Sequence, residues 1–125
     1  MAITYDFWLG KLLAAAAQIE DEEAQVRRWL AADVRAWERP VELLLNLEDI
    51  NLELFIEEHR NRFSEPQLPT ATELAAAAVQ FNCGPDGWRN PHEVLLDPVW
   101  EEVRRRARAF ISAFKSEAQP LSAEQ

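Results

Sequence analysis

The sequence predicts an all-α fold: a single compact domain of five or six helices in an orthogonal or bundle-like arrangement. Alanine and leucine are abundant, β-branched residues are sparse, and only three of the 125 residues are glycine, a balance that favours helix over sheet. Apolar residues make up 48% of the chain, which suits a globular core and is too high for a disordered chain. Their recurrence at intervals of three and four residues indicates amphipathic helices.

The first helix is predicted to begin near Thr4 or Asp6, because either side chain can cap a helix. Apolar residues then recur at helical spacing: Trp8, Leu12, Ala16, Ile19, Val26, Trp29, Leu30, Val34 and Trp37. An acidic cluster at 20–23 interrupts this pattern, and acidic residues suit the N-terminus of a new helix. We therefore favour two helices broken near Glu20 over one continuous helix across 6–38.

Pro40 ends this region, because the residue before a proline avoids the α conformation, and it can also begin the next helix. The apolar spacing that follows predicts a helix carrying Leu43, Leu44, Leu47, Ile50 and Leu54. A short break at 46–51 is an alternative, and 50–54 also alternates as a strand would.

The stretch 64–69 contains two prolines and is predicted to be a linker between helices. Thr70 and Glu73 match a capping box, so the next helix is expected to begin at this pair and to end before Gly84. Residues 85–87 are a predicted turn.

Two further N-cap signals, Asn90 and Asp97, each stand directly before a proline. The second begins a long helix predicted over 98–115. Its expected buried stripe is Val99, Val103, Ala107, Phe110 or Ile111, and Phe114. We expect one domain over 1–115 and a flexible tail over 116–125, which has few apolar groups.

The compartment is predicted from what the chain lacks. Cys83 is the only cysteine, so no internal disulfide can form, and this fits a reducing environment. The N-terminal residues do not resemble a signal peptide. No apolar run approaches the roughly 20 residues that span a bilayer. We expect a cytoplasmic protein.

The net charge of −9 repels nucleic acid and anionic lipid and attracts basic partners. The chain has eleven arginines and two lysines. Arginine favours fixed, bidentate pairing with carboxylates, so we expect ordered ion pairs at the surface; a GC-rich genome is the alternative explanation.

The stretch 41–58 contains six acidic residues and no basic one: Glu42, Glu48, Asp49, Glu53, Glu57 and Glu58. On a continuous helix Asp49, Glu53 and Glu57 share one face, where like charges destabilise the helix by about 0.2–0.5 kcal/mol per pair. A basic partner would explain the stripe. The alternatives are a tertiary arginine or a cost too small to matter.

A second candidate contact is the loop at 83–91, which holds Trp88 and Arg89. These residue types are enriched at binding hot spots, although Trp88 folded onto the core is the alternative. The basic run at 104–108 is expected to be a solvated face, because Glu101 and Glu102 stand four residues before Arg105 and Arg106. A docking site for a carboxylate or a phosphate is the alternative.

Catalytic and metal-binding patterns are missing. Neither His59 nor His92 follows a Glu at the Glu-x-x-His offset, and a lone cysteine does not make a zinc site. No glycine-rich phosphate loop is present. Cys83, Asp86 and His92 form only a nominal nucleophilic set. We expect no cofactor and no enzymatic activity.

The leading hypothesis is a non-enzymatic binding domain that docks a basic partner protein through the carboxylates of 42–58, helped by Trp88 and Arg89. An inhibitor or immunity protein among small bacterial accessory proteins is its concrete form. The alternatives are a homodimer formed through 6–38, and a small-molecule binder or enzyme with a pocket between helices.

Overall fold

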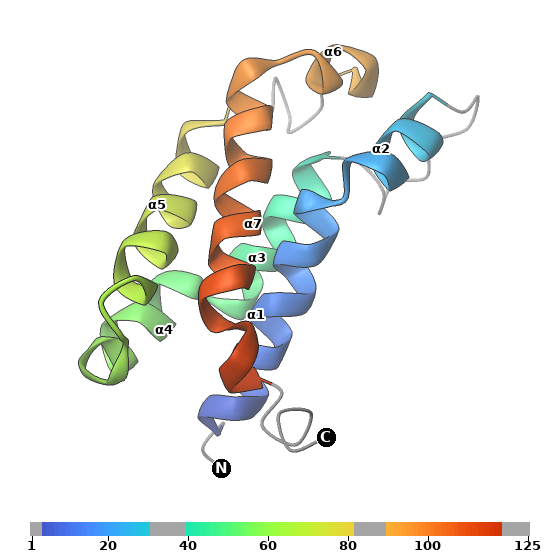
Figure 1. Cartoon of the computed structure of the whole chain (residues 1–125). Coiled ribbons are helices and arrows are strands. Elements are labelled where there is room, and N and C mark those ends of the chain that lie inside the picture. Colours follow the sequence, from blue (N-terminus) through green and yellow to red (C-terminus); the bar gives the residue numbers. More distant parts are fainter. Residues whose placement is uncertain (1–3, 31–39, 82–89, 119–125) are drawn as a thin grey trace.

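The computed structural model describes residues 4–30, 40–81 and 90–118 (Figure 1). These ranges contain helices and short connections, with no strand among them, which confirms the all-α class. In chain order the elements are α1 (Tyr5–Glu20), α2 (Glu22–Trp29), α3 (Pro40–Ile50), α4 (Leu52–His59), the 3-10 helix η2 (Arg60–Arg62), α5 (Gln67–Gln80), α6 (Pro91–Leu95) and α7 (Pro98–Ala118).

The helix α7 lies at the centre of a bundle-like arrangement. It packs against α1 on one side and α5 on the other, α3 packs against α1, and α4 packs against α5 (Figure 1). The short helices α2 and α6 contact each other at one end of the bundle. Fully buried apolar side chains of α1 and α7 form the centre of the core: Leu9, Leu12, Ile19, Trp100, Val103, Phe110 and Phe114.

The break predicted near Glu20 is present. Thr4 caps α1 by accepting a hydrogen bond from the Phe7 amide. The helix α1 ends at Glu20, and the carboxylate of the next residue, Asp21, accepts from the Ala24 amide at 3.1 Å and so caps α2. The side chain of Gln25 turns back and donates to the carbonyls of Gln18 and Ile19 at 3.0 and 2.7 Å. An amide side chain therefore satisfies the C-terminal carbonyls of α1, in a place where many helices use a glycine.

The alternative break at 46–51 is also present, at Asn51. This residue adopts the left-handed conformation (φ 66°), and its side chain accepts a hydrogen bond from the Leu54 amide. Asparagine tolerates this conformation better than most residues. The indole Nε1 of Trp8 donates to the Ile50 carbonyl at 2.7 Å, so a core tryptophan of α1 holds the end of α3 in place.

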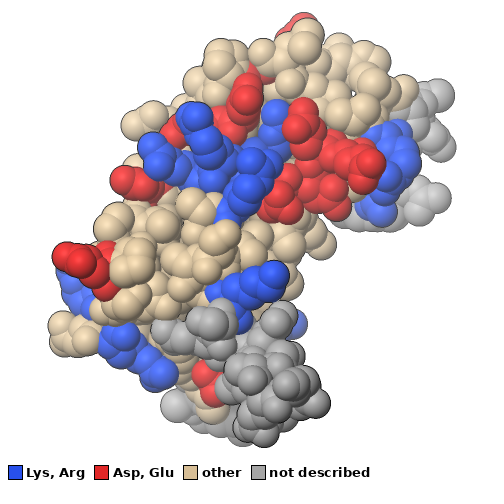
Figure 2. Space-filling view, in the orientation of Figure 1, with Lys and Arg blue, Asp and Glu red and all other residues tan. Residues whose placement is uncertain are grey.

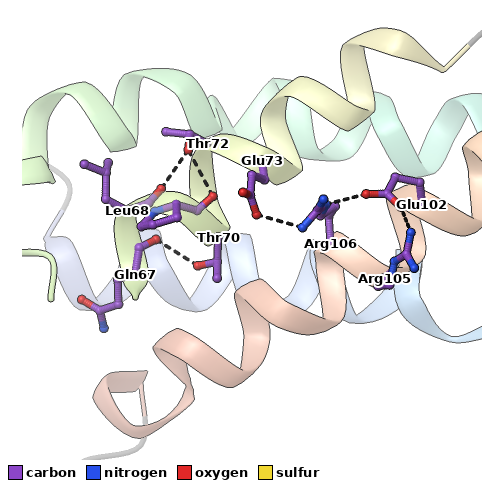
Figure 3. Close-up of polar contacts among 9 residues, drawn as sticks. Gln67, Leu68, Thr70, Thr72, Glu73, Glu102, Arg105 and Arg106 are labelled. Atoms are coloured by element: carbon purple, nitrogen blue, oxygen red, sulfur yellow. Dashed lines mark hydrogen bonds and ion pairs between the residues drawn. The ribbon is translucent and has the colours of Figure 1, made fainter. Parts of the chain in front are cut away.

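The predicted start of the next helix was wrong. The helix α5 begins at Gln67 inside the expected linker, and the Thr70 hydroxyl donates to the Gln67 carbonyl as an ordinary helical residue (Figure 3). The side-chain acceptor of the capping box is Gln67 and not Glu73, because the Gln67 side chain accepts a hydrogen bond from the Ser64 amide at 2.7 Å. Pro69 is tolerated because the first-turn amides of a helix have no intrahelical acceptor.

The helix N-caps predicted at Asn90 and Asp97 are both confirmed. Asn90 accepts from the His92 amide and Asp97 from the Val99 amide, at 2.9 and 2.8 Å. The helix α7 runs to Ala118, beyond the expected end at 115. Its buried stripe begins at Trp100, because Val99 is 39% exposed.

Within the described ranges, no helix has both the length and the apolar character needed to cross a membrane. Gly84, the turn at 85–87, the stretch 31–39 and the last part of the expected tail, 119–125, lie outside the described residues.

Candidate functional site

A groove of about 310 Å³ opens between α3, the start of α4 and α5; we call it the α3–α5 groove. Among the described residues its lining is mostly apolar: Val41, Leu44, Leu45, Leu47, Leu52, Ala75, Ala78, Val79 and Phe81, with Glu48, Asn51 and Glu53 as the polar members. The groove therefore combines an apolar interior with two of the predicted partner-binding carboxylates.

The groove exists because its two walls pack on different neighbours. The helix α3 packs on α1, whereas α5 packs on α7 and α4. On the α5 wall the side chains of Ala75 and Ala78 are too small to fill the space in between. The turn at Asn51 sends α4 away from the line of α3, and this turn forms one part of the lining.

Apolar side chains remain exposed at the groove. Val79 is 75% exposed and Leu45 is 39% exposed, while Leu44, Leu47, Leu52 and Phe81 of the same lining are buried. Neither exposed residue belongs to the core-facing stripe of its helix. An exposed apolar surface that adjoins a hollow and has polar residues beside it is typical of binding sites.

A second hollow continues the groove along α4 and α5. It is lined by Glu53, Ile56, Glu57, Arg60, Thr72 and Ala75. Because Glu53 and Ala75 line both hollows, the depression extends past the Asn51 turn and reaches Glu57.

The six acidic residues of 42–58 form what we call the acidic face. Glu42 is half-buried, and the other five are exposed. Among the described residues, no arginine or lysine forms an ion pair with any of these six carboxylates. A tertiary arginine, the alternative explanation raised by the sequence, is therefore not found in the described part of the chain.

The predicted stripe on one helix face needs correction. The helix breaks at Asn51, so Asp49 lies on α3 while Glu53 and Glu57 lie on α4. The expected spacing of four residues on a continuous helix holds only for Glu53 and Glu57. The break thus removes part of the repulsion that a continuous helix would have between Asp49 and Glu53.

In contrast to the carboxylates of the acidic face, the arginines of α7 form ion pairs within the chain. Arg106 pairs with Glu102 at 2.6 Å and with Glu73 of α5 at 2.9 Å, and Arg105 also pairs with Glu102 (Figure 3). The expected pair of Glu102 with Arg106 is confirmed, whereas Arg105 takes Glu102 and not Glu101.

The expectation of a solvated face was wrong for Arg104, which is only 5% exposed. Its guanidinium lies 3.5 Å from the Gln25 side chain and 3.5 Å from the Glu22 carboxylate. Arg108 pairs with Glu20 of α1 at 3.4 Å. Figure 2 shows acidic and basic side chains side by side across this face. The positive charge of α7 is thus used to hold α1, α2 and α5.

The other predicted residues are placed as follows. Trp88, Arg89, Cys83 and Asp86 lie outside the described residues. His92 is exposed on α6. In the part of the chain that is described, no three His, Cys, Asp or Glu side chains are grouped as a metal site would require.

All three described tryptophans pair with other core rings, as expected for core residues. Trp8 lies 5.2 Å from Phe55, Trp29 lies 5.7 Å from Trp100, and Trp100 lies 5.0 Å from Phe81. The apolar stripe of α1 is covered by α7 and α3 of the same chain. A homodimer formed through 6–38 stays a prediction; within the described part of that segment, Val26 of α2 and Leu30 directly after it are exposed apolar side chains.

Sequence reasoning missed the α5 wall. Ala75, Ala78 and Val79 fall within the helix that the sequence predicts between Thr70 and Gly84, and no partner-binding role is predicted for them. The available signal was Val79, an apolar residue displaced from the stripe of Ala71, Leu74 and Ala77 that faces the core.

Searches against models of protein families, curated proteins and solved structures return no match for this chain.

Proposed function

We propose that this protein is a non-enzymatic binding domain that docks a basic surface of a partner protein at the acidic face and the α3–α5 groove. One observation carries the proposal. The acidic face has no cationic partner among the described residues, while the arginines of α7 are engaged with other carboxylates.

The two parts of the site would have different physical roles. The acidic face, in a chain of net charge −9, speeds the approach of a basic protein and selects against acidic ones. The groove supplies apolar contact area, which is the usual source of lasting affinity. The exposed side chains of Leu45 and Val79 are the first candidates for these contacts.

An inhibitor or immunity protein acting in the cytoplasm is the concrete form of this proposal. Proteins that act on nucleic acid or on membranes commonly carry basic surfaces, so a basic, protein-binding target suits a negatively charged domain. Neutralising such a target requires tight, specific association and no chemistry.

The test uses charge reversal. A partner is captured from the native host by pull-down, and its affinity is measured for the wild type and for the triple variant Asp49→Lys, Glu53→Lys, Glu57→Lys. We expect the triple variant to lose at least about tenfold in affinity, which is about 1.4 kcal/mol.

The matched control reverses three exposed carboxylates elsewhere, Asp6, Glu65 and Glu93, and so makes the same change in net charge. Thermal melting shows that both variants are folded. If the control weakens binding as much as the triple variant, net charge alone acts and the acidic face is not the interface. Unchanged binding by the triple variant rejects the proposal.

A further inference from the structure

We infer that the α3–α5 groove receives an amphipathic α-helix of the partner, with an apolar stripe inside the groove and lysine or arginine residues along its flanks. This inference rests on the proposed function and specifies which kind of basic surface is bound.

The walls of the groove favour a helix over an extended peptide. Extended peptides bind by adding a strand to a sheet edge or by docking a polyproline segment on aromatic walls. The described ranges contain no sheet, and among the described residues Phe81 is the sole aromatic one in the lining. Two helical walls with apolar side chains between them match the helix-in-groove mode of recognition.

The small residues of α5 allow close approach. Ala75 and Ala78 are separated by three positions, so they lie on the same side of α5 one turn apart. A third helix can therefore come near the α5 backbone at this point and pack at the short end of the usual interaxial range of about 8–10 Å.

The volume fits side chains of a helix. At about 310 Å³ the groove is at the lower limit of pockets that enclose a drug-sized ligand, about 300–1,000 Å³. The hollow that continues the groove past Glu53 and Ala75 can hold a further side chain of the docked helix. Apolar residues at positions i and i+3 or i+4 of a docked helix have the spacing needed to enter the groove and this neighbouring hollow.

The charges define the flanks of the docked helix. The ionisable lining residues within the described ranges are Glu48 on α3 and Glu53 on α4, both exposed carboxylates. Lysine or arginine beside the apolar stripe of the incoming helix would pair with them. A second copy of this chain is a poor occupant, because two bodies of charge −9 repel and the described arginines of α7 already have partners.

The experiment is an NMR titration of the ¹⁵N-labelled full chain with a synthetic peptide of leucine and lysine. Leucines occupy positions i, i+3, i+4 and i+7 of each repeat, so that the helix has one apolar stripe. We expect chemical-shift changes to concentrate at Leu45, Ala75, Ala78 and Val79. NMR detects even millimolar affinity, so a probe that is not optimised is sufficient.

Two variants block the groove, and each has a matched control on the same helix. Val79→Arg places a cation at a position that is 75% exposed, where folding is not at risk, and Ala78→Trp fills the groove. Ala76→Arg and Ala76→Trp make the same changes at an exposed position of α5 outside the lining. We expect both groove variants to weaken peptide binding by about tenfold or more and both controls to leave it unchanged.

A scrambled peptide of the same composition, which has no apolar stripe, separates the two proposals. If the scrambled peptide binds as well as the striped one and only reversal of Glu48 and Glu53 weakens it, the helix inference is overturned while the acidic face keeps its proposed role. If the striped peptide shifts no groove resonance, or if Val79→Arg and Ala76→Arg bind it equally, the helix inference also fails. The pull-down experiment then decides the proposed function separately.

Discussion

The indole Nε1 of Trp100 donates a hydrogen bond of 3.1 Å to Oε1 of Gln25, and both side chains are buried, at 0% and 4% exposure. The amide end of Gln25 donates to the last carbonyls of α1. A single glutamine therefore connects α1, α2 and α7, and its donors and acceptor are all used inside the core.

Replacement of Gln25 by leucine would leave the Trp100 indole and the α1 carbonyls without these partners. Each buried polar group left unsatisfied costs about 1–3 kcal/mol. We expect Gln25→Leu to lower the free energy of unfolding by about 2–4 kcal/mol in urea denaturation. Gln18→Leu, on an exposed side chain, is the control and should change it by less than about 0.5 kcal/mol. Equal effects of the two variants would contradict the structure.

Gly10 lies inside α1 on its exposed side, and a Cβ atom added there meets nothing within 4 Å. Glycine in a helix interior is less stable than alanine by about 0.5–1 kcal/mol. We expect Gly10→Ala to raise the unfolding free energy by this amount and to raise the melting temperature. A loss of stability would mean that α1 is not an exposed, regular helix at this position.

Asn51 carries the turn between α3 and α4 in the left-handed conformation. Asn51→Ala introduces the steric penalty of that conformation and removes the side-chain acceptor for the Leu54 amide, so we expect a loss of about 1–2 kcal/mol. Asn51→Gly removes only the acceptor and should lose less. If glycine proved worse than alanine, α3 and α4 would be a continuous helix, and the groove built on this turn would be absent.

Arg106 bridges Glu102 and Glu73 and so connects α7 to α5. Both the arginine and Glu73 are more than a third exposed, so a double-mutant cycle with Arg106→Gln and Glu73→Gln should give a coupling of only about 0.2–1 kcal/mol, weaker at high salt. A coupling of zero at low salt would contradict this prediction and show that the bridge does not stabilise the packing of α5 on α7.

Helix ends that depend on neighbouring residues could be predicted from the sequence. Thr4, Asn90 and Asp97 cap their helices as expected, because the acceptor side chain and the amide it caps lie within three residues of each other. The start of α5 could not be predicted in this way. There, Gln67 also donates to the Ala113 carbonyl of α7, and such a contact between distant residues has no local signature.

The same distinction applies to the candidate site. The acidic face was found by counting charges over a continuous stretch. The burial of Arg104 was missed because it depends on Gln25, 79 residues away, and the groove was missed because its walls come from α3 and α5. Hydrophobic periodicity assigns residues to helices, but it does not show which apolar side chains remain uncovered after the helices pack.

The central claim is that the acidic face attracts a positively charged protein, and the association rate tests it most directly. Stopped-flow mixing with the captured partner would compare the wild type with a variant carrying Gln at Glu48, Glu53 and Glu57 and Asn at Asp49. We predict that the wild-type rate falls by about tenfold or more between low and high salt, as electrostatic steering requires, and that the variant is slow with little salt dependence. Equal rates and equal salt dependence for the two proteins would contradict the account.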